Sequence, residues 1–198
     1  MRPYLLKLKT LSNSLKKIFL TSFILLLVDQ VTKLLVKNFM QIGEEIIIFD
    51  WFRLHFIENS GMAYGIGSDW GEIAKFFLTF FRIVVVIFGV FYIRRIISEK
   101  QLPVRLLICL GLIIGGALGN VIDSVFYGFV FDETSFFQGK VVDMLYFPLT
   151  GESYFLPDWL PFFGGNHFIF FRPIFNIADA GIFIGITCLL IFYRRYFQ

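Results

Sequence analysis

The stretch LGLIIGGALGNVIDSVF, from Leu110 to Phe126, decides what kind of molecule this chain can form. It is apolar, carries glycine at every fourth position from Gly111 to Gly119, and ends in Asn120 and Asp123. Glycines spaced in this way let a second helix approach closely inside a membrane. A carboxylate beside hydrocarbon is costly and usually functional. The stretch therefore predicts a membrane-spanning helix with an acid at its end that is under structural or chemical constraint.

The composition of the chain extends this prediction to the whole molecule. Its 198 residues are 57% hydrophobic and 17% charged, and the mean hydropathy is +0.74. An ordinary globular domain carries roughly 25% charged residues. We therefore expect an α-helical integral membrane protein, folded as a single membrane domain over residues 1–198. Segments close to the roughly 20 residues that span hydrocarbon lie at about 18–36, 73–93, 104–126 and 174–193.

The distribution of lysine and arginine predicts the topology. These residues precede the first segment, bracket the turn between the second and third, and follow the fourth. By the positive-inside rule, both termini and the middle turn are cytoplasmic. The first segment resembles a signal peptide, but no small-residue cleavage site follows it, so we expect it to be retained as a membrane span.

The two connections on the opposite side are expected to carry structure. Residues 41–70 are rich in β-branched and aromatic types and contain several glycines, which predicts a small extracytoplasmic β-cradle. Residues 127–173 combine many aromatic side chains with prolines. Aromatic rings favour the headgroup zone of a bilayer, so this connection is expected to be an aromatic interfacial loop.

Asp29 and Lys33 are four residues apart in the first span and therefore share one helical face. With a rise of about 1.5 Å per residue, Asp29 lies about 16 Å into the membrane. Lys33 could extend outward toward the headgroups. The pair is either a structural pin between helices or a contact to a substrate, and the sequence leaves both readings open.

Asp143 and Asp179 form the second pair of interest. Asp143 lies in the connection after the third span, and the same rise per residue puts Asp179 about 21 Å from the inner edge of the fourth. Two carboxylates in one sheltered site repel each other, so one should hold a proton at neutral pH. An aspartic protease works in this way. The alternative is that each acid is a solvated or helix-capping group.

Other site chemistries find little support in the sequence. The two histidines, His55 and His167, have no ligand-type spacing, so we expect no metal and no cofactor. Cys109 and Cys188 lie in apolar runs and do not suggest a disulfide framework. Basic and aromatic residues do not alternate as they do in nucleic-acid-binding proteins.

Five fragments in this order resemble lipoprotein signal peptidase, also called signal peptidase II. They are VDQVTK (28–33), ENSGMAYG (58–65), GGALGNVID (115–123), KVVDM (140–144) and FNIADA (175–180). The resemblance implies four transmembrane helices and an outward β-cradle. It also implies an aspartyl endopeptidase of the bacterial cytoplasmic membrane, with its active site toward the outer face. The implied substrate is a prolipoprotein bearing diacylglyceryl, which is cut just before the lipidated cysteine. We expect a monomer in contact with membrane lipids.

The resemblance also implies roles for individual residues. Asp143 and Asp179 would be the catalytic pair, and Asn176 would orient them. Asn120 and Asp123 would hold the site together from beneath. Residues with supporting or substrate-binding roles would be Asp29, Lys33, Asn59 and Gly61.

The chain departs from the family pattern in three places. Ser124 stands where an arginine usually follows the acid of the GNVID fragment. Asp132 lies about where many members carry a catalytic acid, so it competes with Asp143, and we interpret residues 132–139 as an insertion. The separation of Asp143 from Asp179 is also large, owing to the aromatic stretch 148–173, which could be a lid or a surface anchor.

Two rival functions remain at the sequence level. A small proton-coupled transporter or channel could use Asp29, Asp123 and Asp179 as a proton relay. The acids lie toward one side of the membrane, however, and no internal repeat is visible, whereas transporters commonly have repeats and midplane sites. A catalytically inactive scaffold that binds lipidated peptides is the third reading.

Overall fold

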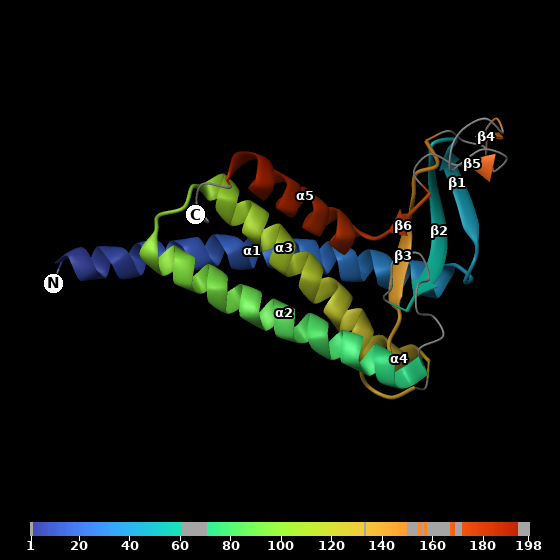
Figure 1. Ribbon diagram of the computed structural model, residues 1–198, viewed down its shortest axis with the longest axis horizontal. Helices are drawn as coiled ribbons and strands as arrows, with labels where there is room; N and C mark the ends of the chain where they lie inside the picture. The colour runs from blue at the N-terminus through green and yellow to red at the C-terminus, as the bar shows by residue number, and fades with distance from the viewer. Residues whose placement is uncertain are drawn as a thin grey trace.

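The computed structural model describes residues 2–60, 71–132, 134–149, 154–155, 157, 167–168 and 172–193. The helices are α1 (Arg2–Phe39), α2 (Gly71–Glu99), α3 (Val104–Ile122), α4 (Gly128–Phe131) and α5 (Ile177–Phe192), and a π-helical turn η3 (Asp123–Tyr127) joins α3 to α4. The strands are β1 (Glu45–Phe49), β2 (Phe52–Asn59), β3 (Val141–Tyr146), β4 (Tyr154–Phe155), β5 (His167–Phe168) and β6 (Ile174–Phe175). The long helices form a bundle with a small antiparallel sheet at one end (Figure 1).

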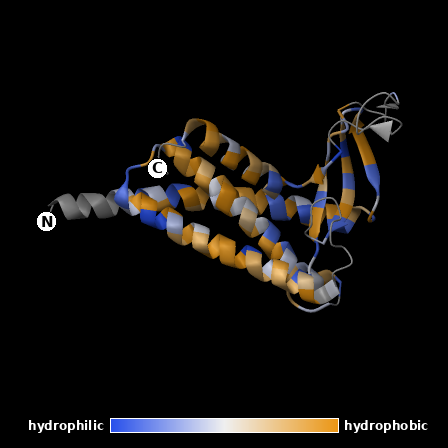
Figure 2. Cartoon of the chain, in the orientation of Figure 1, coloured by the Kyte–Doolittle hydropathy of each residue, from blue (hydrophilic) through white to orange (hydrophobic). Residues whose placement is uncertain are grey.

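The outer surface of the bundle is apolar. Phe19, Phe88 and Phe183 are each 70% or more exposed, and apolar residues cover most of the length of the helices in Figure 2. In water such a surface would be unfavourable, whereas in a bilayer it faces lipid. Within the described ranges, three helices are long and apolar enough to cross a membrane, namely Thr10–Phe39, Ile73–Glu99 and Val104–Phe131. This confirms a multi-pass membrane protein.

The helix boundaries differ from the predicted spans. The first and second helices extend past the predicted 18–36 and 73–93, and the third continues through η3 and α4 to Phe131 rather than ending at 126. The helix in the span predicted at about 174–193 begins three residues later, because Ile174 and Phe175 form β6 and α5 begins at Ile177. The described part of α5 has 16 residues, or about 24 Å.

The glycines of α3 allow its close packing against two neighbours. A Cβ atom at Gly115 would lie 2.7 Å from the backbone oxygen of Ser22 on α1. A Cβ atom at Gly116 would overlap the backbone oxygen of Ala178 on α5. The α3 helix is therefore the centre of the bundle, in contact with α1 on one side and α5 on the other.

The sheet joins segments that are far apart in the sequence. Its strand order is β1-β2-β3-β6, and every neighbouring pair is antiparallel. The predicted cradle supplies β1 and β2, and residues 61–70 of it lie outside the described residues. The third strand, β3, comes from the predicted interfacial loop at 127–173. That loop is therefore not only a surface segment, because its residues 141–146 complete the sheet.

The sheet is fixed to the bundle by a small apolar core. Its buried side chains come from α1, from β2, from η3 and from β3, and they are Val36, Phe56, Tyr127, Val142 and Met144. Because β3 belongs to this core, Asp143 between Val142 and Met144 is held next to the ends of the helices. The fold thus brings the acids of β3, η3 and α5 into one region.

Candidate active site

Asp143 lies on β3 with 1% of its surface exposed. Asn59 of the neighbouring strand β2 donates a hydrogen bond to its Oδ2 at 3.1 Å, and Asn176 donates to its Oδ1 at 2.7 Å. Both carboxylate oxygens therefore have a fixed donor. These two hydrogen bonds fix the orientation of the carboxyl plane of Asp143, and a reacting carboxyl needs such a fixed orientation.

Asp179 occupies the first turn of α5. It shares a capping box with Asn176, whose Oδ1 accepts from the backbone N–H of Asp179 at 2.9 Å. Asn120 of α3 donates to Asp179 Oδ1 at 2.7 Å. The N-terminus of a helix favours negative charge. Asp179 therefore helps to cap α5, which is one of the two roles considered from the sequence. The same position is compatible with a chemical role.

Asn176 links the two acids. It is fully buried, its side-chain nitrogen contacts Asp143, and its side-chain oxygen contacts the backbone of Asp179. Burial, and after it the negative charge of Asp179, raises the pKa of Asp143 to about 7. The two carboxyls are therefore electrostatically coupled, and one proton shared between them is expected near neutral pH.

Beneath this pair, Lys33 forms the centre of a buried ionic cluster. Its Nζ lies 2.8 Å from Asp29 Oδ2 and 2.8 Å from Asp123 Oδ2, and it donates to Asn120 Oδ1 at 3.0 Å. The predicted ion pair of Asp29 and Lys33 is confirmed. The idea that Lys33 extends outward is wrong, because its side chain is completely buried between two carboxylates.

Asp29 and Asp123 each connect Lys33 to another part of the fold. Asp29 Oδ1 accepts from the backbone N–H of Ala178 in α5 at 2.8 Å. Asp123 Oδ2 accepts from the backbone N–H of Val142 in β3 at 3.3 Å. The cluster therefore ties together the segments that carry Asp143 and Asp179. This geometry favours the structural reading of the Asp29–Lys33 pair.

Sequence reasoning did not single out Gln30 and Tyr127, which complete the cluster. Gln30 donates to Asp123 Oδ1 at 2.9 Å and accepts from the hydroxyl of Tyr127 at 3.2 Å. A signal for Gln30 was available, since it is polar and follows Asp29 within an apolar helix.

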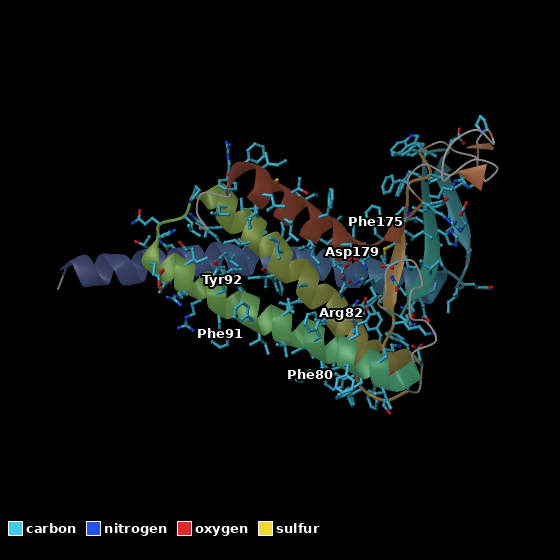
Figure 3. The ribbon with its side chains drawn as sticks, in the orientation of Figure 1. Phe80, Arg82, Phe91, Tyr92, Phe175 and Asp179 are labelled. Carbon is cyan, nitrogen blue, oxygen red and sulfur yellow. The ribbon has the colours of Figure 1, made fainter. Side chains whose placement is uncertain are left out.

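Sequence reasoning also missed Arg82. This residue lies on α2, and its Nη1 donates to Ser124 Oγ at 2.8 Å. Figure 3 labels Arg82 on α2 and Asp179 at the start of α5. The signal was a lone arginine inside the apolar run 73–93, because charges within a span are usually functional.

Asp132, the competing candidate for the catalytic acid, belongs to a different group of charged side chains. It caps α4, and its carboxylate lies 3.3 Å from Lys37 Nζ, which also pairs with Glu58. Burial acts to raise the pKa of Glu58, but hydrogen bonds and charge from Lys37 and Lys140 outweigh it and lower that pKa. The structure therefore places Asp143, and not Asp132, beside Asp179.

The π-helical turn explains how the chain returns from α3 to β3. A π-turn leaves backbone carbonyls free to bond outside the helix, and the carbonyls of Ser124 and Val125 accept from the backbone N–H groups of Gly139 and Phe137. A Cβ atom at Gly139 would overlap the backbone oxygen of Asp123. Phe137 and Gly139, in the segment interpreted as an insertion, thus dock onto η3, and the chain continues from them into β3.

One predicted site residue, Gly61, lies outside the described residues. Across the described segments, no group of three or more histidine, cysteine, aspartate or glutamate side chains could hold a metal ion.

An apolar helical bundle with two coupled carboxyls at a sheet-capped end has the make-up of a membrane-embedded aspartic peptidase. The family model described as signal peptidase (SPase) II matches residues 21–195. The chain belongs to the signal peptidase II family, which confirms the resemblance of the five fragments and the aspartic peptidase class.

Individual relatives agree with this assignment. A lipoprotein signal peptidase of Porphyromonas gingivalis is 43% identical, with 87% of this chain and 80% of that protein covered. A second lipoprotein signal peptidase, from Amoebophilus asiaticus, is 35% identical, with 92% of this chain and 79% of that protein covered. A solved bacterial membrane enzyme has a TM-score of 0.61 at 27% identity, covering 90% of this chain and 87% of that one. These matches give no support to the transporter alternative.

Proposed function

We propose that this enzyme removes signal peptides from prolipoproteins modified with diacylglyceryl, cutting just before the lipidated cysteine. Membership of the signal peptidase II family supports the reaction class. The single observation that carries the chemistry is the coupling of Asp143 to Asp179 through Asn176. We propose these two aspartates as the catalytic pair.

In the proposed mechanism one carboxyl is ionised and the other is protonated. The ionised carboxylate takes a proton from water as the water oxygen attacks the scissile carbonyl carbon. The protonated carboxyl hydrogen-bonds to the carbonyl oxygen, on which negative charge develops. Asn59 and Asn176 hold Asp143 in position through both of its oxygens. The Lys33 cluster holds β3 and α5 at a fixed separation.

The lipid on the substrate explains why such a site belongs at a membrane boundary. Removing an acyl chain from the bilayer costs about 0.8 kcal/mol per CH₂ group. The substrate therefore enters sideways from the membrane, with its acyl chains still in lipid. We propose that the site faces the outer side of the bacterial cytoplasmic membrane, that α5 is a fourth span, and that the enzyme acts as a monomer.

The test is a comparison of two substrates. Purified protein in detergent is incubated with one prolipoprotein in its diacylglyceryl-modified and unmodified forms. The expected result is a cut before the cysteine in the modified form only, with the same rate after addition of a metal chelator. Equal cutting of both forms would refute the lipid requirement. Binding of the modified form without any turnover would instead identify an inactive scaffold.

A further inference from the structure

Arg82 is the only charged residue in the sequence between Lys75 and Arg94. At a rise of about 1.5 Å per residue it lies about 18 Å along the helix from Arg94 and about 16 Å from Gly71. A guanidinium so far inside an apolar helix is costly unless it has polar neighbours. We therefore expect Arg82 to have polar partners and a function that offset this cost.

The contacts of Arg82 lead to the proposed catalytic pair. Its Nη1 donates to Ser124 Oγ at 2.8 Å, and Ser124 donates to the backbone oxygen of Asn120, also at 2.8 Å. The side chain of Asn120 donates to Asp179 at 2.7 Å. The guanidinium also interacts electrostatically with carboxylates in the order Asp179, Asp123, Asp143. The strongest of these interactions is therefore with Asp179.

The charge balance of the site makes this interaction important. Among the described residues, the charged groups around the pair are Asp29 and Lys33 from α1, Arg82 from α2, and Asp123 from η3. Lys37, Glu58, Asp132 and Lys140 form a separate cluster of ion pairs. Within the described part of the chain, Lys33 is paired with Asp29 and Asp123, and Arg82 is a second cation that acts on the two acids.

The two acids differ in their surroundings. Asp143 is buried on β3, whereas Asp179 is half-buried at the N-terminus of α5. A buried carboxyl favours its neutral form, and a helix N-terminus favours a carboxylate. A nearby guanidinium that interacts most strongly with Asp179 adds to this difference.

We propose that Arg82 is a positioning residue of the peptidase reaction, which keeps Asp179 ionised as the base and leaves the shared proton on Asp143. This inference rests on the proposed function. Asp179 then takes a proton from the attacking water, and Asp143 gives its proton to the carbonyl oxygen. When the C–N bond breaks, the proton on Asp179 passes to the leaving nitrogen. Asp143 recovers its proton from the hydroxyl of the tetrahedral intermediate, so both acids return to their initial states.

The role of Ser124 follows from the same geometry. Its hydroxyl anchors the guanidinium beside the turn that carries Asp123. The side chain of an arginine at position 124 would begin beside the present position of the Arg82 guanidinium. A cation introduced at position 124 would therefore be attached to η3 close to the point that the Arg82 guanidinium reaches from α2.

The test measures kcat/KM against pH for cleavage of the diacylglyceryl-modified prolipoprotein. Arg82→Gln keeps a hydrogen-bond donor but removes the charge. Loss of a cation raises the proton affinity of both acids. We expect both limbs of the bell-shaped profile to move up by about one pH unit, with about a tenfold loss on the acid limb. Arg82→Lys should keep the wild-type profile. Arg95→Gln, the same change at an exposed site on α2, should alter nothing.

The double variant Arg82→Gln/Ser124→Arg tests relocation of the charge. A return of the profile to its wild-type position supports the proposal, and it can be measured even if Arg82→Gln alone does not fold. A folded Arg82→Gln protein with an unchanged profile, or a double variant whose profile stays displaced, overturns it. If the wild-type protein cleaves no prolipoprotein, it is the proposed function that fails, so the two failures are distinguishable.

Discussion

Lys33 shows at the scale of a single residue why the acids of this protein can be buried together. Its ammonium group is the contact shared by Asp29 and Asp123, and all three side chains are fully buried. Removing one member of a buried ionic group leaves the others uncompensated. The cluster is therefore expected to be more important for folding than for chemistry.

Lys33→Met is predicted to destabilise the protein by about 3–5 kcal/mol because two buried carboxylates lose their cation. Lys17→Met is the matched control, since Lys17 is an exposed residue of the same helix α1. It should change the stability by about 0.5 kcal/mol or less. Thermal unfolding in detergent measures both. Equal losses for the two variants would contradict the assignment of Lys33 as the centre of the cluster.

The raised pKa of Asp143 predicts a pH dependence of stability. Burial, and then Asp179, raises this pKa from 3.8 to about 7. The folded state therefore holds the proton more tightly than the unfolded state, and the stabilisation this provides is lost as the pH rises from about 4 through about 7. Asp143→Asn abolishes the titration. Its stability relative to wild type should increase by about 4 kcal/mol across that range.

This prediction is checked by thermal unfolding of both proteins in detergent between pH 4 and pH 9. The difference between them should grow up to about pH 8 and then remain constant. A difference that does not depend on pH would show that Asp143 titrates normally in the folded protein.

At the scale of elements, the helices could be predicted from sequence far better than the sheet. Long apolar runs and flanking cations are local signals, and they predicted the bounds of α2 and α3 to within about two turns, whereas α1 begins at Arg2, well before the predicted 18. The pairing of β2 with β3 joins Ile57 to Asp143 across the whole of α2 and α3. No local pattern encodes such a pairing, because it depends on how η3 and the following loop redirect the chain.

The glycines of α3 allow a direct test of how closely its helices pack. Gly115→Ala would place a Cβ atom 2.7 Å from the Ser22 backbone. The helices must then move apart, at a cost of about 1–3 kcal/mol. Gly89→Ala on α2 is the control, since nothing lies within 4 Å of its Cβ position. We expect only the Gly115 variant to lower the unfolding temperature, and a neutral result there would contradict the close contact of α3 with α1.

The site itself was partly predictable from sequence. Asp143, Asp179, Asn120 and Asn176 could be nominated because polar residues at the ends of apolar runs stand out. Arg82 and Gln30 are polar residues inside apolar helices, so a signal was present for each, but the role of each appears only when its partner on another helix is known. The same holds for the choice between Asp143 and Asp132, which depends on the tertiary position of β3.

At the scale of the whole molecule, the sheet at one end of the bundle and the basic residues at the other end indicate an orientation in the membrane. The first residues of α1 lie at the end of the bundle opposite the sheet (Figure 1). Arg94, Arg95 and Arg105 flank the α2–α3 turn. By the positive-inside rule we propose that this end is cytoplasmic and that the sheet and the candidate site lie outside.

Thiol labelling tests this topology. In a background with Cys109 and Cys188 replaced by alanine, a cysteine is introduced at Ser135, between α4 and β3, or at Gln101, in the α2–α3 turn; both positions are exposed. A membrane-impermeant maleimide applied to intact spheroplasts should label the first and not the second. The opposite pattern would invert the proposed orientation of the site.

The most direct measurement of the central claim is the rate of signal-peptide removal from a diacylglyceryl-modified prolipoprotein by three matched variants. Asp143→Asn and Asp179→Asn should each lose at least about a thousandfold in kcat, because proton transfer at the reacting atoms is removed. Asp132→Asn should retain a rate within a few fold of wild type, because its carboxylate pairs with Lys37 and not with Asp179. Full activity in either of the first two variants, or its loss in the third, would contradict the Asp143–Asp179 pair.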